Sequence, residues 1–468
     1  MRPPMTNRAR LPGRITRKQT SRPVLKAGAR VSEHRLENGL RVLLAERHSD
    51  PVVALVLLYR AGARTESERE AGVSHFLEHM MFKGTLRLGK GEVDRITTEL
   101  GGQNNAYTGY DHTAYWFELA SDRWEQALEI EADRMQNLLL DPGELEAERA
   151  VVLEELSMGE DDPWRVLSRH AEAALFPHHP YGRPIIGYPD TVGGLTSAVV
   201  RDYYRRFYHP ANATLVVSGD LDPAAALRAV RRRFGSIPGG VPFEQAGVFR
   251  RKLEELPGEL RVNTSWDDTG QRLVIGWPTM PVGTQEDYAL DLAMTVLASG
   301  RMSRLWRRLV LEEGLATSIS ASNDSRVEAG ALWIYAECAQ GVAPTRLERA
   351  IDEELERIAR ERVSAGELER ARALILAAEA FESETVSDVA EELGEWAMDA
   401  DWRSAFDGGK AHDRIDAQEL REVVRRFLRP ERRVVGWCRP RTGAERAGTA
   451  PGRKTKARVA KRAARKRR

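Results

Sequence analysis

The chain has 468 residues, of which 42% are hydrophobic and 30% are charged, a composition typical of globular proteins with two or more domains. No stretch approaches the roughly 18 consecutive apolar residues of a membrane-spanning helix, so we expect no membrane span. The net charge of +1 is uneven: residues 1–30 carry nine Lys and Arg, residues 451–468 carry ten, neither segment contains an acid, and residues 31–450 are left with −18.

Both basic ends are expected to be solvated, because blocks of like charge repel one another. We predict a flexible arm over residues 1–32 and a disordered tail over residues 441–468, and nucleic acid is not an expected partner. The N-terminus lacks the apolar segment of a secretory signal, which favours a cytoplasmic location. Its basic, acid-free composition is also compatible with a transit peptide.

The first half of the chain is predicted to mix strands and helices, starting with a β-hairpin over residues 34–46 that turns at Asn38 and Gly39. One helix has a clear beginning, because Asp141 can cap its N-terminus and Pro142 suits its first turn. The elements expected after the hairpin are a strand over 51–63, a helix from HFLEH to about Gly84, a turn-like stretch over 101–110, a strand over 113–119, helices over 121–139 and 142–158, a strand over 213–222 and a helix over 223–234.

The second half repeats this order after a predicted domain boundary at residues 235–247, which are rich in Gly and Pro. Its expected elements are a strand over 272–280, helices over 287–299 and 303–314, a strand over 331–339, two helices between 343 and 383, and a strand over 432–440. We therefore predict an α+β fold of two topologically similar domains, 33–240 and 241–440. Each domain should have a mainly antiparallel sheet with helices packed on one face.

The sequence VSHFLEHMMFKGT, residues 73–85, places His75, Glu78 and His79 within one helical turn. Residues three and four apart share a helix face, so both imidazoles can bind one metal ion. Glu78 then lies beside them as a candidate base for a water on that metal. This H-x-x-E-H order is the inverzincin signature of zinc peptidases. The neighbouring residues are apolar, and polar side chains on a buried helix need partners.

The third metal ligand has to come from another element. The two cysteines, Cys338 and Cys438, are far apart and form no zinc-binding pattern, so any metal has to be held by histidine and carboxylate. The predicted helix after Asp141 and the residues that follow it contain six candidates: Glu144, Glu146, Glu148, Glu154, Glu155 and Glu160. Glu148 and Glu155 are two helical turns apart and share a face, but spacing alone does not choose between this pair and Glu154.

The stretch with the H-x-x-E-H order and four further ones follow one another in a characteristic order: GVSHFLEHMMFKGT, GGQNNAYTGYDHTAYWFEL, ERAVVLEELSMGEDDP, HPYGRPIIGYPDTV and YHPANATLVVSGDLD. Together they resemble the pitrilysin-type zinc metallopeptidases, which include insulysin and the mitochondrial processing peptidases. The resemblance extends over about residues 33–440 and is densest over 33–220. It implies one zinc ion per chain, bound by His75, His79 and Glu155. It also implies that Glu148, seven residues before Glu155, is a carboxylate that supports the ligands.

The resemblance further implies an endopeptidase that hydrolyses extended peptides. Glu78 would take a proton from the zinc-bound water and pass it to the leaving amine, while the zinc polarises the scissile carbonyl. The peptide would bind as an added strand along a sheet edge, near Asn105 and Ala106. The residues alone leave another role open for Asn105, as a turn residue beside Gly101 and Gly102.

One departure from the family pattern lies in the second domain. Active relatives carry an Arg and a Tyr seven residues apart, in a stretch like REKRGLAYSV, that help to bind substrate. The matching stretch here, VLEEGLATSI, has Val310 and Thr317 at these positions. Arg304, Arg307 or Arg308 could replace the guanidinium, but no residue there replaces the phenol. We hypothesise that this chain is the zinc-bearing member of a heterodimer whose homologous partner supplies the Arg and Tyr. A homodimer is the alternative.

A non-catalytic structural or scaffold subunit of the same family is the alternative to a peptidase. Subunits of that kind are relatives in which the metal site is eroded. This chain keeps every position of the site: His75, Glu78, His79, Glu148 and Glu155. The complete set favours the peptidase.

Overall fold

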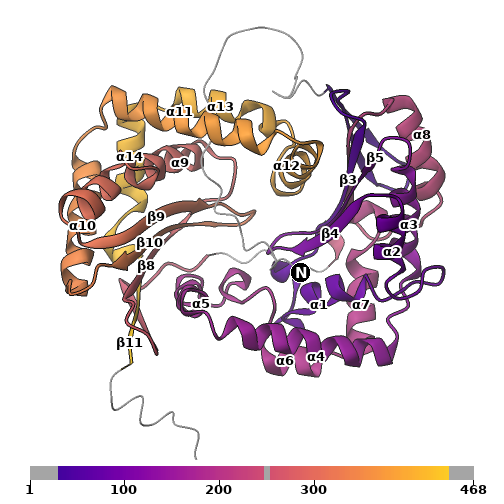
Figure 1. Ribbon diagram of the computed structural model, residues 1–468, viewed down its shortest axis with the longest axis horizontal. Coiled ribbons are helices and arrows are strands. Elements are labelled where there is room, and N and C mark those ends of the chain that lie inside the picture. The colour runs from indigo at the N-terminus through magenta and orange to yellow at the C-terminus, as the bar shows by residue number, and fades with distance from the viewer. Residues whose placement is uncertain (1–29, 247–252, 442–468) are drawn as a thin grey trace, which may run out of the picture.

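The computed structural model describes residues 30–246 and 253–441, which form two β-sheets surrounded by helices (Figure 1). Each sheet is built from one half of the chain, which confirms the predicted α+β fold of two similar parts. The first strand begins at Arg30, inside the segment expected as an arm, while residues 1–29 and 442–468 lie outside the described residues. The limits of the two domains stay a prediction. Within the described ranges, no helix is long and apolar enough to cross a membrane.

The first sheet has six strands in the order β1-β2-β6-β3-β5-β4, and its neighbours are antiparallel except for β2 and β6. The predicted hairpin is confirmed, because β1 pairs with β2 around a turn in which Gly39 has a φ of 93°. The strands are β1 (Arg30–Arg35), β2 (Arg41–Glu46), β3 (Val52–Tyr59), β4 (Gln103–Thr108), β5 (Thr113–Ala120) and β6 (Ala213–Gly219). β4 therefore forms one edge of this sheet.

The second sheet repeats the topology of the first with five strands in the order β7-β11-β8-β10-β9. Its one parallel pair, β7 with β11, corresponds to β2 with β6, and the antiparallel pairs follow in the same sequence. The strands are β7 (Leu260–Trp266), β8 (Arg272–Thr279), β9 (Ala316–Asp324), β10 (Gly330–Cys338) and β11 (Val434–Pro440). The two halves are thus similar in topology, as predicted.

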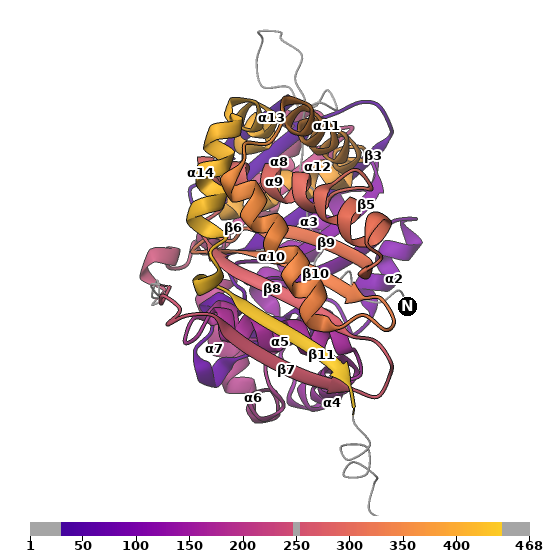
Figure 2. The same cartoon turned by 90° about the vertical axis from the view of Figure 1, so that its left-hand side faces the viewer.

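Most helices pack on one face of the sheet of their own half and enclose an apolar core there. In Figure 2, α10 lies in front of the second sheet. The first-half helices are α1 (Val73–Met80), α2 (Glu92–Glu99), α3 (Glu125–Asn137), α4 (Pro142–Gly159), α5 (Pro163–Leu175), α6 (Pro189–Gly194), α7 (Ser197–Phe207) and α8 (Pro223–Phe234). The second-half helices are α9 (Gln285–Ala298), α10 (Pro344–Arg360), α11 (Ala365–Glu382), α12 (Val386–Asp399), α13 (Ser404–Arg414) and α14 (Ala417–Phe427).

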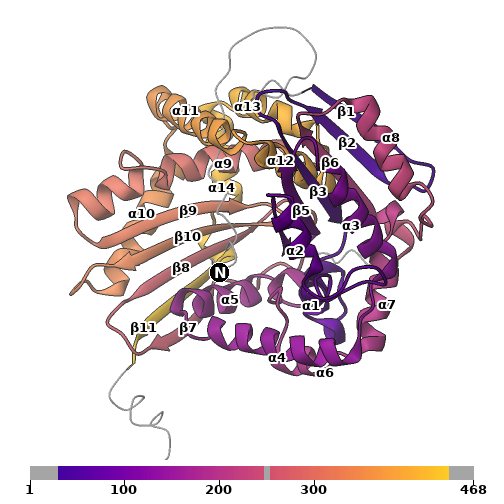
Figure 3. The same cartoon turned by 45° about the vertical axis from the view of Figure 1, so that its right-hand side comes forward.

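The other face of each sheet is covered by a helix from the opposite half. Helix α12 packs on β3 and β6 through an apolar cluster that includes Leu58, Val389 and Leu393. Helix α5 packs on β7, β8 and β11, and Leu167 and Val274 belong to its cluster. Figure 3 shows α5 below the second sheet and α12 beside the first. Most helices thus pack on one face of the sheet of their own half, as predicted. The other face of each sheet is covered by α5 or α12, which the two halves exchange.

Three strands lie where the sequence predicts none, and all three are sheet edges: β4, β7 and β9. Their sequences, QNNAYT, LRVNTSW and ATSISASND, are polar because an edge strand is covered less completely than a central one. The turn-like interpretation of residues 101–110 is therefore wrong over Gln103–Thr108. The helix predicted over 303–314 is present as a π-helix over Trp306–Glu312.

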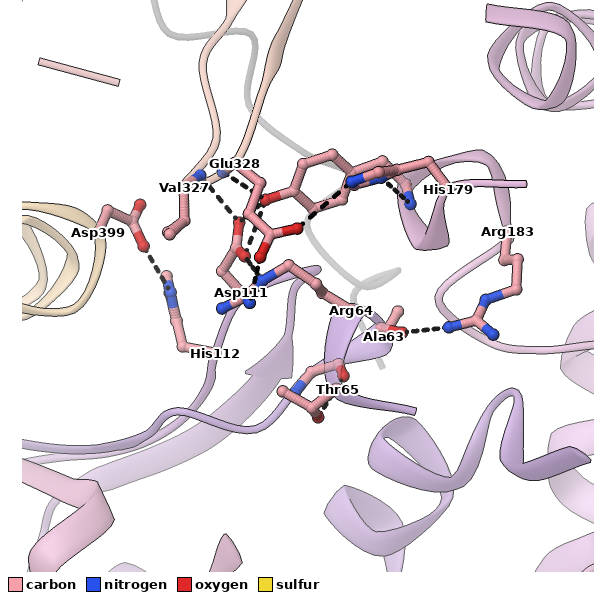
Figure 4. Close-up of polar contacts among 12 residues, drawn as sticks. Ala63, Arg64, Thr65, Asp111, His112, His179, Arg183, Val327, Glu328 and Asp399 are labelled. Carbon is pink, nitrogen blue, oxygen red and sulfur yellow. Dashed lines mark hydrogen bonds and ion pairs between the residues drawn. The ribbon is translucent and has the colours of Figure 1, made fainter. Parts of the chain in front are cut away.

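The two halves meet at a buried polar cluster beside the loop between β9 and β10 (Figure 4). Arg64 of the first half donates a hydrogen bond to Glu328 of the second at 3.1 Å and also pairs with Asp111. The hydroxyl of Tyr181 donates to both carboxylate oxygens of Asp111 at 2.9 and 3.0 Å. Nε2 of His179 lies 3.3 Å from Glu328. Because these groups are buried and mutually paired, they hold the halves in one relative orientation.

Candidate metal centre

Helix α1 is fixed at its N-terminus and along its apolar side. Gly72 precedes it with a φ of 95°, a conformation that suits glycine. The carboxylate of Glu66 accepts hydrogen bonds from the backbone N–H groups of Gly72 and Ser74 at 2.9 and 2.8 Å. The buried apolar residues of the helix are Val73, Phe76, Leu77 and Met80. Its polar side presents the three residues of the motif, His75, Glu78 and His79.

Helix α4 begins at the predicted Asp141 cap and packs against α1, which brings Glu155 to both histidines. Oε2 of Glu155 lies 3.7 Å from Nε2 of His75 and 3.6 Å from Nε2 of His79. The neighbouring Glu154 is exposed. Of the two glutamates that spacing alone left open, Glu155 is the one that the fold directs at the histidines.

These three side chains fit a metal ion. One ligand atom from each of His75, His79 and Glu155 lies within 4.8 Å of the others, and no second group of this kind occurs among the described residues. Two ligands of a tetrahedral zinc ion, each at about 2.0–2.1 Å, are separated by roughly 3.3–3.4 Å. The 3.6 and 3.7 Å distances are close to that value. Two imidazoles and a carboxylate are also a donor set of catalytic zinc sites, which keep a fourth position for water.

The second nitrogen of His79 is held by Glu148, as the resemblance implies. Nδ1 of His79 lies 2.9 Å from Oε1 of Glu148, whose other oxygen contacts the ammonium group of Lys83. Burial opposes the charged form of Glu148, but hydrogen bonds from His79 and Lys83 outweigh it and lower the pKa of this carboxyl. Glu148 is therefore a carboxylate that accepts a hydrogen bond from Nδ1–H of His79, which leaves the lone pair of Nε2, on the side of Glu155, for a metal ion.

His75 has a different environment. Burial, followed by the charges of His79 and Arg165, lowers the pKa of His75 to about 3. The imidazole is therefore neutral, which is the form that binds a metal. Its Nδ1 is buried and has no hydrogen-bond partner within the part of the chain that the structure describes.

Glu78 lies on the same side of α1 and contacts β4. The hydroxyl of Thr108 donates a hydrogen bond to Oε2 of Glu78. Burial raises the pKa of Glu78, although the hydrogen bond from Thr108 and the charge of His79 oppose the shift. A carboxylate with a raised pKa is a stronger base at neutral pH, so Glu78 suits the role of proton acceptor.

Asn105 and Ala106 lie in β4, where they pair with Trp116 and Tyr115 of β5. The alternative of a turn at Asn105 is wrong, because the residue belongs to a strand. Among the strands of residues 30–246 and 253–441, β4 pairs with β5 alone, so its outer edge can accept a further strand. Contact of these two residues with a substrate stays a prediction.

The arginines that could replace the missing guanidinium are all engaged in ion pairs. Arg304 contacts Glu367 at 2.7 Å, Arg308 contacts Glu313 at 2.6 Å and Arg307 contacts Glu312 at 3.2 Å. Val310 packs against the apolar core of the second half. The hydroxyl of Thr317 donates to the backbone carbonyl of Glu337 at 3.4 Å.

Sequence reasoning missed Lys83 and Thr108, which hold Glu148 and Glu78 respectively. Lys83 stands in the quoted stretch VSHFLEHMMFKGT, four residues after His79, so its proximity to the site was a usable signal. Thr108 offered none, because its contact depends on the edge strand that the sequence did not predict.

Comparison with known proteins gives two matching family models. Residues 41–188 match the model described as Insulinase (Peptidase family M16), and residues 194–375 match the model described as Peptidase M16 inactive domain. An uncharacterized zinc protease of Mycobacterium leprae is 31% identical over 309 residues, which are 65% of this chain and 68% of that protein.

Solved structures show the same fold at lower identity. A protease from Helicobacter pylori is 23% identical and superposes with a TM-score of 0.84 over 88% of this chain and all of its own. A peptidase M16 inactive domain from Pseudomonas fluorescens is 17% identical, with a TM-score of 0.79 over 88% of this chain and 98% of its own. At such identities the likeness concerns the fold alone.

Proposed function

Because the chain belongs to the M16 family of peptidases, we propose that it is a zinc-dependent endopeptidase that hydrolyses extended peptides. The main support is the convergence of His75, His79 and Glu155 beside Glu78. A metal ligand set next to a buried carboxylate of raised pKa provides what hydrolysis of a peptide bond needs: an activated water and a group that accepts its proton.

In the proposed reaction, zinc held by His75, His79 and Glu155 would lower the pKa of a bound water and polarise the scissile carbonyl. Glu78 accepts the proton of the attacking water and later gives it to the departing amine. The hydrogen bond from Thr108 holds one carboxylate oxygen of Glu78, so the other oxygen remains for this proton.

The substrate is proposed to add to the outer edge of β4 as a further strand. The contact between Thr108 of β4 and Glu78 supports this placement, because it puts the edge strand next to the base. A peptide that pairs with the backbone near Asn105 and Ala106 would present its main chain, rather than one particular side chain, to the site. The proposal therefore names extended peptides and no particular sequence.

We propose that the chain is the zinc-bearing member of a heterodimer. The support is Val310 and Thr317 at the positions of the Arg and Tyr of active relatives, together with the ion pairs that occupy Arg304, Arg307 and Arg308. A homologous partner chain would supply the missing guanidinium and phenol. The cytoplasmic location and the absence of a nucleic-acid partner stay predictions.

The experiment is hydrolysis of a quenched-fluorescent peptide library by the purified, zinc-loaded chain and by its Glu78→Gln variant. The variant keeps the three ligands, so both proteins should bind zinc equally. Peptide cleavage that disappears in the variant would support the peptidase and, since one chain suffices, would contradict the heterodimer. Cleavage that survives in the variant would contradict the role of Glu78.

A non-catalytic scaffold subunit is the second candidate, and the match of residues 194–375 to a domain described as inactive is the observation that favours it. The two candidates differ in zinc binding. A chain that binds zinc but cleaves only after a homologous chain with an Arg/Tyr pair is added is the expected heterodimer. A chain that binds no zinc would instead be a scaffold.

A further inference from the structure

Lys83 lies three residues beyond the end of α1, where the backbone makes a tight turn. The N–H groups of Phe82 and Lys83 donate to the carbonyls of His79 and Met80 at 3.2 and 3.0 Å. The turn directs the Lys83 side chain toward α4, where its ammonium group contacts Oε2 of Glu148. This lysine side chain is 22% exposed and its partner 7%, so the contact is largely shielded from water.

Both oxygens of Glu148 are thus occupied by groups on or next to α1. Oε1 faces Nδ1 of His79 at 2.9 Å, and Oε2 faces Lys83. Bonds at both oxygens leave the carboxylate little freedom to rotate about its terminal bond. Without the ammonium group, the buried oxygen would have to find another donor or turn toward water, and either movement would weaken the bond to Nδ1.

The two histidines differ in this respect. Nδ1 of His75 has no hydrogen-bond partner within the described ranges, so nothing there selects its tautomer. Nδ1 of His79 has Glu148, which fixes both the tautomer and the orientation of the ring. The precise placement of one ligand therefore depends on the Glu148 carboxylate, and the placement of that carboxylate depends on the lysine.

We infer that Lys83 is a positioning residue of the metal centre, which acts through Glu148 to orient His79 for zinc binding. The inference rests on the proposed function only in taking the ion to be zinc, and it concerns metal affinity rather than catalysis. It also assigns a role to the polar residue that interrupts the apolar run after the H-x-x-E-H motif.

The test measures the zinc dissociation constant by competition with a chromogenic chelator for the full chain and for Lys83→Met, Glu148→Gln and the double variant. Loss of a group that supports a ligand typically weakens metal binding by about 10–100-fold, and we expect a loss in this range for each single variant. If Lys83 acts only through Glu148, the double variant should bind zinc no more weakly than Glu148→Gln alone.

Two controls separate positioning from general damage. Lys90 pairs with Glu144 of α4 at 2.6 Å but touches neither histidine, so Lys90→Met should bind zinc like the unaltered chain. Lys83→Arg can keep the ion pair with Glu148 and should retain most of the zinc affinity. This variant replaces Lys83→Met in the test if Lys83→Met does not fold.

Unchanged affinity in Lys83→Met would overturn the inference, as would tighter binding, which would mean that the lysine acts by charge repulsion. If Lys83→Met weakens zinc binding as much in the Glu148→Gln variant as in the unaltered chain, Lys83 acts on the metal centre by another route. A chain that binds zinc but cleaves no peptide, even after a homologous chain with an Arg/Tyr pair is added, would count against the peptidase and leave this measurement intact. A chain that binds no zinc would overturn both.

Discussion

Two adjacent glutamates of α4 have opposite surroundings. Glu155 lies 3.6–3.7 Å from an imidazole nitrogen of each histidine, whereas Glu154 is exposed. We therefore predict that Glu155→Ala weakens zinc binding by more than about 100-fold, since a direct ligand matters at least as much as the groups that support one. Glu154→Ala is the matched control and should leave zinc affinity, measured by chelator competition, unchanged. Equal losses in both variants would contradict the ligand assignment.

Glu66 gives a pH dependence to stability. Burial raises the pKa of Glu66 to about 7, and hydrogen bonds from the backbone N–H groups of Ser74 and Gly72 only partly oppose it. The folded state thus binds this proton more tightly than the unfolded chain, so the contribution is complete below about pH 4.5 and is lost as the pH rises through about 7. At about 1.4 kcal/mol per pKa unit, the loss amounts to roughly 3 kcal/mol.

We predict that the free energy of unfolding of Glu66→Gln, relative to the unaltered chain, rises by up to roughly 3 kcal/mol between about pH 4.5 and pH 7. Urea unfolding of the two zinc-free proteins at several pH values measures this difference. The subtraction cancels every other group that titrates in both proteins. If the free energies of unfolding of the two proteins change with pH in parallel, the carboxyl of Glu66 keeps an ordinary pKa in the folded chain.

The site could be largely predicted at this scale, because its central residues are tied to helical periodicity. His75, Glu78 and His79 share a face by spacing alone, and the resemblance selected Glu155 and Glu148. Lys83 and Thr108 could not be assigned in the same way. Their contacts depend on where a turn and an edge strand lie relative to the helices, and no local pattern encodes that placement.

Among the elements, α12 makes an unusually close approach to the first sheet. A Cβ atom on Gly394 would lie 2.5 Å from Cδ1 of the buried Leu58 of β3. We predict that Gly394→Val lowers the free energy of unfolding by about 1–3 kcal/mol, because the added side chain has to push α12 from the sheet. On α11, a Cβ on Gly366 would meet no atom within 4 Å. Gly366→Val is therefore the control and should change stability little in thermal or urea unfolding.

Central strands could be predicted from the sequence, whereas three edge strands could not. The central strand β3 is a continuous apolar run, β6 has an apolar middle, and both were predicted, as were the helices α10 and α11. The missed strand β9 has exposed Thr317, Ser318 and Ser320, so its residues resemble a loop. Its strand conformation comes from pairing with β10, a long-range contact that overrides local propensity.

At the scale of the whole molecule, the repeated topology was predicted, while the way in which the halves join was not. The polar cluster around Arg64 and Glu328 links residues about half the chain apart, and it includes the loop that precedes β10 (Figure 4). Arg64 is followed directly by Thr65 and Glu66, and the carboxylate of Glu66 caps α1. The contact between the halves at Arg64 thus lies two residues before Glu66, a group that fixes the helix of the metal centre.

The exchange of α5 and α12 has a consequence for how the chain folds. If the chain were cut between its two similar halves, each fragment would expose one apolar face of its sheet. The first fragment would also carry α5, and the second α12, without the sheet on which that helix packs. Neither fragment should fold alone, but a mixture of the two should assemble, because each supplies the cover that the other lacks. Resemblance between the halves therefore does not make them independent: the halves share a topology, but the whole chain has to fold as one cooperative unit.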